Sequence, residues 1–156
     1  MINKIAIDRT VIIYTDGACS GNPGIGGWGA LMIWGNHSRK IYGGSADTTN
    51  NKMELTAVIE ALSTLKRSCQ INLYTDSQYV KNGITDWIRK WEKNGWKNSK
   101  KENVANRELW QKLSDLVKQH RIEWFWVRGH SDNEMNSIAD ELAKAGIRDI
   151  RARQNS

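Results

Sequence analysis

Two segments of the chain end in the same tripeptide, Tyr-Thr-Asp, and each places a carboxylate at the end of a predicted strand. Residues 11–16 are VIIYTD, and residues 71–76 are INLYTD. Their β-branched and aromatic side chains are typical of buried strands. A carboxylate at the end of a core strand is costly to desolvate unless a partner compensates its charge. Two strands that end alike can hold Asp16 and Asp76 side by side at one edge of a sheet.

Two further carboxylates lie beside the apolar faces of predicted helices. Glu54 lies in a helix that Asn51 is expected to cap, within about 40° of Val58 on a wheel of 3.6 residues per turn. Taken alone, Glu54 is more simply a charge at the start of a helix, satisfied by the helix dipole and the cap backbone. Asp140 lies in a predicted final helix over 133–145, and taken alone it is a surface carboxylate.

The four carboxylates must also be considered together, because clustered acids require a compensating charge. They are Asp16, Glu54, Asp76 and Asp140. Like charges that pack together raise one another's pKa values and destabilise a fold unless a cation compensates them. Ligands that are all oxygen favour Mg²⁺, or Mn²⁺ as a substitute, over zinc, and the sequence shows no cluster of Cys and His. A site that holds two ions about 3.5–4 Å apart suits phosphodiester hydrolysis, because one ion activates water and the other stabilises the leaving oxygen.

The densest positive charge in the chain lies in residues 87–101, where basic side chains alternate with tryptophans. The basic residues are Arg89, Lys90, Lys93, Lys97, Lys100 and Lys101, and the tryptophans are Trp87, Trp91 and Trp96. One interpretation is a solvated helix face and loop that the tryptophans anchor to the body of the protein. The other is a surface that binds nucleic-acid phosphates, which the net charge of +6 also favours. We expect the second, because a polar loop rarely needs so many basic residues among indoles.

A glycine-rich stretch follows Asp16. Within it, Gly24 to Gly29 matches the letters of the dinucleotide-binding motif G-x-G-x-x-G. That motif requires a helix that opens directly after the glycines. Residues 30–35 are instead a predicted strand, so we expect the glycines to form the loop of an antiparallel connection.

The remaining patterns predict an α/β fold. They indicate strands over 38–44 and 122–127, an amphipathic helix over 107–119, and two short helices over 77–83 and 85–91, with Gly83 as the end of the first. At 156 residues the chain is expected to be a single domain (1–156), with a core over about 10–146 and a polar tail over 147–156.

Composition also limits the location and the partners. Cys19 and Cys69 are too few for a disulfide framework, and no apolar run suffices for a signal peptide or a membrane span. We therefore expect a cytoplasmic protein with no membrane partner. No separate association segment is evident, so a monomer is expected.

Five motifs, in order and spacing, resemble type 1 ribonuclease H from residue 14 to about residue 145. They are YTDG (14–17), TNNKMEL (49–55), TDSQYV (75–80), WVRGH (126–130) and DELA (140–143). The resemblance implies a ribonuclease H-like fold, a five-stranded mixed sheet with helices on both faces. It also implies an endonuclease that hydrolyses the RNA strand of RNA/DNA hybrids, gives 5′-phosphate and 3′-hydroxyl ends, and uses one or two Mg²⁺ ions.

The same resemblance assigns roles to individual residues. The family's four metal-binding carboxylates fall on Asp16, Glu54, Asp76 and Asp140. Its loop histidine, which is assigned to proton transfer or product release, falls on His130. From the sequence alone, His130 is a surface histidine in a loop.

Contacts with the hybrid follow from the resemblance one position at a time. Contacts in the minor groove with RNA 2′-hydroxyls fall on Cys19, Asn22, Asn50 and Gln78. Contacts with the DNA strand fall on Asn51, on Thr49 and Asn106 in a phosphate pocket, and on Trp87 against a deoxyribose. Segment 87–101 corresponds to the family's basic protrusion. Such a surface would recognise shape and 2′-hydroxyls rather than base sequence.

Two positions depart from the family pattern. Asp47 stands where many members have an arginine of the phosphate pocket, and the loop over 131–135 lacks the usual Gly and Pro and adds two acids. Two other functions stay open: a non-catalytic module that binds hybrid or RNA, and a polynucleotidyl transfer enzyme such as an integrase or resolvase. The complete set of four carboxylates favours an enzyme over the module. The hybrid contacts and the basic protrusion favour a ribonuclease over the transfer enzyme.

Overall fold

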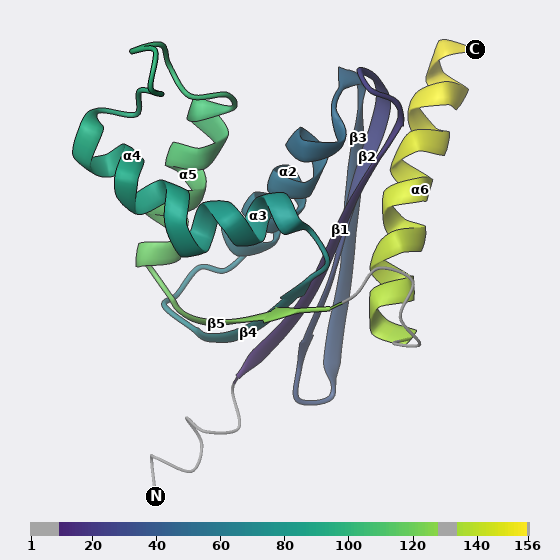
Figure 1. The fold of residues 1–156 in the computed structure, drawn as a ribbon. Helices are drawn as coiled ribbons and strands as arrows, with labels where there is room; N and C mark the ends of the chain where they lie inside the picture. Colours follow the sequence, from purple (N-terminus) through teal and green to yellow (C-terminus); the bar gives the residue numbers. More distant parts are fainter. Residues whose placement is uncertain (1–9, 128–133, 156) are drawn as a thin grey trace, which may run out of the picture.

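The computed structural model describes residues 10–127 and 134–155 and is built on one five-stranded sheet (Figure 1). The strands are β1 (Val11–Gly21), β2 (Gly24–Trp34), β3 (His37–Thr48), β4 (Gln70–Thr75) and β5 (Arg121–Trp126). Their order in space is β3-β2-β1-β4-β5. The pairs β1–β2 and β2–β3 are antiparallel, whereas β1–β4 and β4–β5 are parallel. The prediction of a five-stranded mixed sheet is confirmed.

Helices cover both faces of this sheet (Figure 1). They are α2 (Asn50–Ser63), α3 (Gln78–Asn82), the π-helical turn η1 (Gly83–Trp87), α4 (Ile88–Asn94), α5 (Arg107–Lys118) and α6 (Glu134–Gln154). Helix α6 lies on one face and the other helices lie on the opposite face, where Ile13, Leu55 and Trp110 are fully buried in the main core. Among the described helices, none has both the length and the apolarity that crossing a lipid bilayer requires.

Helix α2 begins earlier than the sequence indicates. Thr49, not Asn51, is its N-cap, and Thr49 Oγ1 accepts a hydrogen bond from the Lys52 N–H at 3.2 Å. A threonine cap satisfies one of the free amides of the first turn. Because the cap lies earlier, Glu54 is more than one turn inside the helix and cannot reach back to the cap backbone.

The glycine-rich stretch after Asp16 is strand rather than loop. Strand β1 continues to Gly21 and β2 begins at Gly24, so the antiparallel connection is a tight turn. The glycines are needed because α6 packs on the backbone of β2: a Cβ atom at Gly29 would lie 2.8 Å from Ala139 O. Helix α6 comes from the far end of the chain, so a local pattern does not reveal it. The β2–β3 hairpin also stands where the dinucleotide motif requires a helix.

Residues 78–94 form three consecutive helical segments, although we expected an interruption after Gly83. Gly83 has φ −65° and ψ −46°, which are right-handed helical angles. A Cβ atom at this position would lie 2.6 Å from Cζ2 of Trp110. Helix α3 ends at Asn82 with Gly83 as its C-cap, as predicted, but the chain continues directly into the π-helical turn η1. The glycine is also required for close packing against α5.

Helix α6 continues to Gln154, so the prediction of a polar tail over 147–156 is wrong. Ile147 and Ile150 are only 8% and 9% exposed. The helix lies close to the sheet at Gly146, where a Cβ atom would be 3.1 Å from Gly27 Cα. Two isoleucines among arginines make too sparse a stripe to be recognised in the sequence, yet they extend the core to residue 150.

Candidate active site

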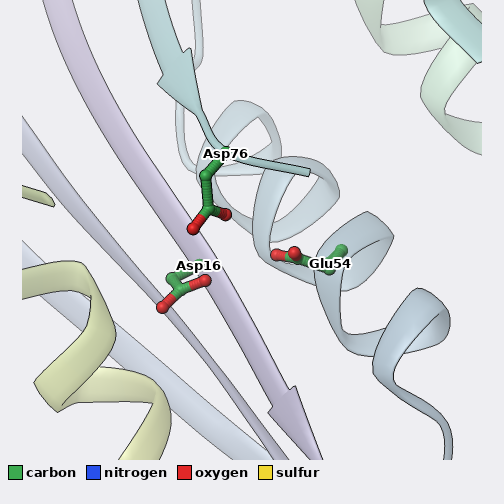
Figure 2. A group of neighbouring side chains, drawn as sticks. All are labelled: Asp16, Glu54 and Asp76. Atoms are coloured by element: carbon green, nitrogen blue, oxygen red, sulfur yellow. The ribbon is translucent and has the colours of Figure 1, made fainter. Parts of the chain in front are cut away.

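The parallel pairing of β1 and β4 places two carboxylates next to each other. Tyr14 and Tyr74 are paired directly across these strands, and their ring centroids are 4.4 Å apart. Asp16 and Asp76 each follow two residues later, and residues i and i+2 of a strand face the same side. Figure 2 shows their carboxylates side by side.

Glu54 reaches the same place from helix α2 (Figure 2). The helix approaches β1 closely at Gly17, where a Cβ atom would lie 2.9 Å from Glu54 Cα. Glycine is therefore required directly after Asp16. Asp16, Glu54 and Asp76 each offer one carboxylate oxygen, and these oxygens all lie within 4.8 Å of one another. We call these three residues the carboxylate triad.

The triad is electrostatically strained. Burial, followed by the charge of Asp76 and the hydrogen bond and charge of Asp140, raises the pKa of Asp16 from 3.8 to about 8. The Gly17 N–H, which donates to Asp16 Oδ1 at 2.9 Å, opposes this shift. Burial, followed by the charges of Asp16 and Asp76, also raises the pKa of Glu54 well above its usual value.

The triad fits a divalent cation. All of its donor atoms are carboxylate oxygens, which are the ligands of hard cations such as Mg²⁺. Glu54 Oε1 is buried and has no hydrogen-bond partner among the described residues. A bound cation would supply both a partner for this oxygen and the positive charge that the clustered carboxylates require.

Asp140 lies beside the triad rather than within it. It projects from α6 and interacts with the Asp16 carboxyl group. Its Oδ2 atom also accepts from Lys144 Nζ at 3.2 Å, and its side chain is 41% exposed. The structure therefore brings three of the four predicted carboxylates together and leaves the fourth at their edge, shared between Asp16 and a lysine.

Four of the predicted hybrid contacts meet where β1, β3 and α2 end or begin. The Asn50 N–H donates to Asn22 Oδ1 at 3.1 Å, and the Cys19 thiol donates to Thr48 O at 3.4 Å. Thr49 caps α2 between these contacts. Asn51, two residues after Thr49, is exposed on the first turn of α2.

The other predicted contacts lie on the α3–α5 side. Gln78 is exposed at the first turn of α3, two residues after the triad residue Asp76. The Tyr79 hydroxyl accepts from Asn106 Nδ2 at 2.9 Å and from Trp110 Nε1 at 3.0 Å. The ring of Trp87 lies edge-on to Tyr79, with centroids 5.6 Å apart. Tyr79 thus holds two predicted contacts in place.

The predicted basic protrusion comprises α4 and the loop after it. Its basic residues, Arg89, Lys90, Lys93, Lys97, Lys100 and Lys101, are all exposed. Beneath them lies an aromatic cluster of Tyr79, Trp87, Trp91, Trp96 and Trp110, whose neighbouring rings are 5.2–6.3 Å apart. The tryptophans therefore anchor this segment to the body of the protein, as the first interpretation of residues 87–101 required. The basic side chains stay on the surface, where the second interpretation needs them.

Some functional positions were missed or lie outside the described residues. Tyr79 was missed as a support, and only its place three residues after Asp76 could have indicated it. Gly17 was missed as the residue that admits α2. His130 and most of the loop over 131–135 lie outside the described residues, so their predictions stay open.

Comparison with known proteins identifies the family. A sequence model of RNase H matches residues 8–148. Ribonuclease H of Wolbachia pipientis wMel is 58% identical over 141 residues, which cover 90% of this chain and 97% of the relative. Ribonuclease HI of Neisseria meningitidis serogroup B is 54% identical over 140 residues, which cover the same shares of the two chains.

Solved structures agree with the sequence relatives. LC9-RNase H1, a type 1 RNase H with the type 2 active-site motif, matches with a TM-score of 0.82 at 32% identity, over 90% of this chain and 73% of that chain. LC11-RNase H1, solved in complex with an RNA/DNA hybrid, shares the fold with a TM-score of 0.68 at 22% identity, over 90% and 98%. The chain belongs to the RNase H family and is a type 1 ribonuclease H.

Proposed function

We propose that the carboxylate triad, with Asp140 at its edge, is the catalytic centre at which this chain hydrolyses the RNA strand of RNA/DNA hybrids. The products are a 5′-phosphate end and a 3′-hydroxyl end. The observation that carries the proposal is the convergence of three carboxylate oxygens within 4.8 Å, from the middle of β1, the residue after β4 and helix α2. Family membership supports the reaction class.

Divalent metal is the cofactor that the family and the triad imply. We assign Mg²⁺, with Mn²⁺ as a substitute. The chemistry that such ions supply is activation of the attacking water and stabilisation of the leaving oxygen. Asp16 is the candidate shared ligand, because it interacts with Glu54 and Asp76 and also with Asp140. Glu54 would also orient groups near the attacking water through its unpaired oxygen.

The proposed hybrid surface extends from the basic protrusion to the start of α2. Asn106 lines a shallow pocket together with Lys52 and Arg107, whose charges could serve a phosphate in place of the arginine that Asp47 replaces. Asn22 and Asn50 hold each other at 3.1 Å near the minor-groove contacts. We propose that a monomer suffices, because all of these groups come from one chain. We also propose that the protein acts in the cytoplasm.

The test uses a labelled RNA strand paired to DNA, with Mg²⁺ or EDTA, beside duplex RNA, duplex DNA and free RNA. We expect cleavage of the hybrid alone, only with metal, and none by Asp76→Asn. Asp115→Asn, which changes an exposed carboxylate on α5, is the matched control and should cleave like the wild type. Binding of the hybrid without cleavage, in Mg²⁺ and also in Mn²⁺, would instead support the non-catalytic binding module.

A further inference from the structure

The last turns of α6 are fixed beside the turn between β1 and β2. Figure 1 shows the C-terminal end of α6 at the end of the sheet where this turn lies and α2 begins. Ile147 and Ile150 anchor the helix there. Nη2 of Arg151 donates to Ser20 Oγ at 2.6 Å, which joins residues from opposite ends of the chain. Arg151 therefore has a defined place on the surface.

Ser20 lies among the predicted hybrid contacts. The residue before it, Cys19, donates to Thr48 O, and Asn22, two residues after it, accepts from the Asn50 N–H. Consecutive side chains of a strand face opposite sides of the sheet, so Ser20 and Arg151 lie on the side opposite the Cys19 side chain, two residues along the chain from Asn22 in the β1–β2 turn. None of the five motifs that carry the resemblance includes Arg151.

Ordered by their contacts and by their positions in the chain, these residues make a row that ends at the β1–β2 turn. At one end, Asn106 and Lys52 line the pocket between the loop after α4 and the first turn of α2. Asn50, also in that first turn, connects to Asn22 in the β1–β2 turn. Ser20 and Arg151 stand at the other end. A double helix that follows the row from the basic protrusion would reach α6.

The charge of Arg151 is available to a ligand. Its side chain is exposed, and its hydrogen bond goes to a neutral hydroxyl group. Within residues 10–127 and 134–155, no ion pair involves Arg151, and the acid nearest in sequence, Asp149, is engaged by the Tyr42 hydroxyl. A guanidinium group has five donors in a fork that matches two phosphate oxygens.

A simpler explanation is that a cation at the C-terminal end of a helix interacts favourably with the helix dipole. That interaction would direct the side chain toward the last carbonyl groups of α6. Arg151 instead extends across to Ser20, on another element. The dipole accounts for the presence of arginines at this end, and the contact with Ser20 accounts for the direction in which this one points.

We propose that Arg151, oriented by Ser20, binds a backbone phosphate of the RNA/DNA hybrid beyond the minor-groove contacts. The inference rests on the proposed function, because it requires the hybrid to lie along this row. It assigns to the end of α6 a part in holding the substrate that the sequence did not indicate.

The test measures binding without cleavage, in EDTA, by the fluorescence anisotropy of a labelled hybrid over a range of salt concentrations. For Arg151→Ala we expect about 3–10-fold weaker binding at low salt and a slope of log Kd against log salt that is shallower by about 1. Arg151→Lys should keep most of the affinity. Ser20→Ala, which keeps the charge but removes its support, should weaken binding less than Arg151→Ala.

Arg39→Ala is the matched control, because Arg39 is an exposed arginine near the β2–β3 hairpin, at the opposite end of β3 from Thr48. It should bind like the wild type. An unchanged affinity and salt slope for Arg151→Ala would overturn the inference, as would an equal loss in Arg39→Ala, which would indicate net charge alone. A wild-type protein that neither binds nor cleaves hybrid would instead overturn the proposed function.

Discussion

At the scale of single residues, the active site places acids closer together than their charges favour. Asp16 and Glu54 are each less than 10% exposed, and both have raised pKa values because burial and neighbouring carboxylates disfavour their ionised forms. Ionising such groups costs the folded protein free energy. The clustered acids that can bind a cation therefore lower the free energy of unfolding when no cation is bound, and denaturation can measure this loss.

The first prediction concerns Asp16→Asn in the absence of metal. The change removes the carboxyl group whose raised pKa costs the folded state free energy at this pH, so we expect the free energy of unfolding at pH 7.5 in EDTA to rise by on the order of 1–3 kcal/mol. Urea denaturation measures this difference. Asp115→Asn is the control, because it changes an exposed carboxylate on α5 away from the triad, and we expect a change within about 0.5 kcal/mol. A lower stability of Asp16→Asn would contradict the electrostatic account.

The second prediction concerns pH. The pKa of Asp16 is raised from 3.8 to about 8 in the folded state. Its protonated form therefore favours the folded state below the unfolded pKa, and this contribution is lost as the pH rises through the folded value. We expect the stability of the wild type in EDTA, relative to Asp16→Asn, to fall between pH 5 and 8. Urea denaturation at several pH values measures it, and parallel curves for the two proteins would refute it.

The three residues of the carboxylate triad show how far the sequence alone predicts the active site. Asp16 and Asp76 lie close together as predicted, because β1 and β4 pair in parallel register at Tyr14 and Tyr74. The prediction that the first strand ends at Asp16 was wrong, since β1 continues to Gly21. Glu54 was identified through the resemblance, but its local explanation as a capping residue was wrong. Several neighbouring Thr and Asn residues could cap this helix, and the sequence does not show which of them adopts the extended conformation of an N-cap.

At the scale of elements, the sequence did not predict where segments far apart in the chain pack against each other. Gly29 and Gly83 appeared to be a loop residue and a helix end, because glycine usually marks such places. In the structure each admits a partner from another part of the chain: the backbone of α6 at Gly29 and the Trp110 ring at Gly83. Local patterns predicted most helices and strands, but not which backbones touch.

The third prediction tests this explanation at Gly83. Gly83→Ala should lower the free energy of unfolding by about 1–3 kcal/mol, because the added methyl group must displace the buried Trp110 ring. Thermal or urea denaturation measures the loss. If glycine only ended a helix there, alanine would instead stabilise the helical segment, so a more stable variant would contradict the packing explanation.

Gly95→Ala provides the comparison. Gly95 ends α4 at φ +75° with open space around it. We expect a loss of about 1–2 kcal/mol from backbone conformation alone. Because no side chain has to move, the aromatic signal in near-ultraviolet circular dichroism should stay the same in Gly95→Ala and change in Gly83→Ala.

At the scale of the whole molecule, metal binding and folding are linked. The triad comes from β1, α2 and the end of β4, so a cation that joins these elements stabilises only the folded chain. The fourth prediction is that Mg²⁺ raises the melting temperature relative to EDTA. At ten times the dissociation constant the gain is about 1.4 kcal/mol. Asp76→Asn should show little of this gain, and an equal rise in that variant would contradict binding at the triad.

The aromatic cluster beneath the basic protrusion has an optical consequence. Trp87, Trp91, Trp96 and Trp110 lie in it, with neighbouring centroids at most 6.3 Å apart. Indoles this close can exchange excitation energy before they emit, so we expect the cluster to fluoresce as one unit. Trp87 is the predicted contact with a deoxyribose. A hybrid that settles on this single ring should therefore quench all four tryptophans together, and the protein contains its own reporter of substrate binding.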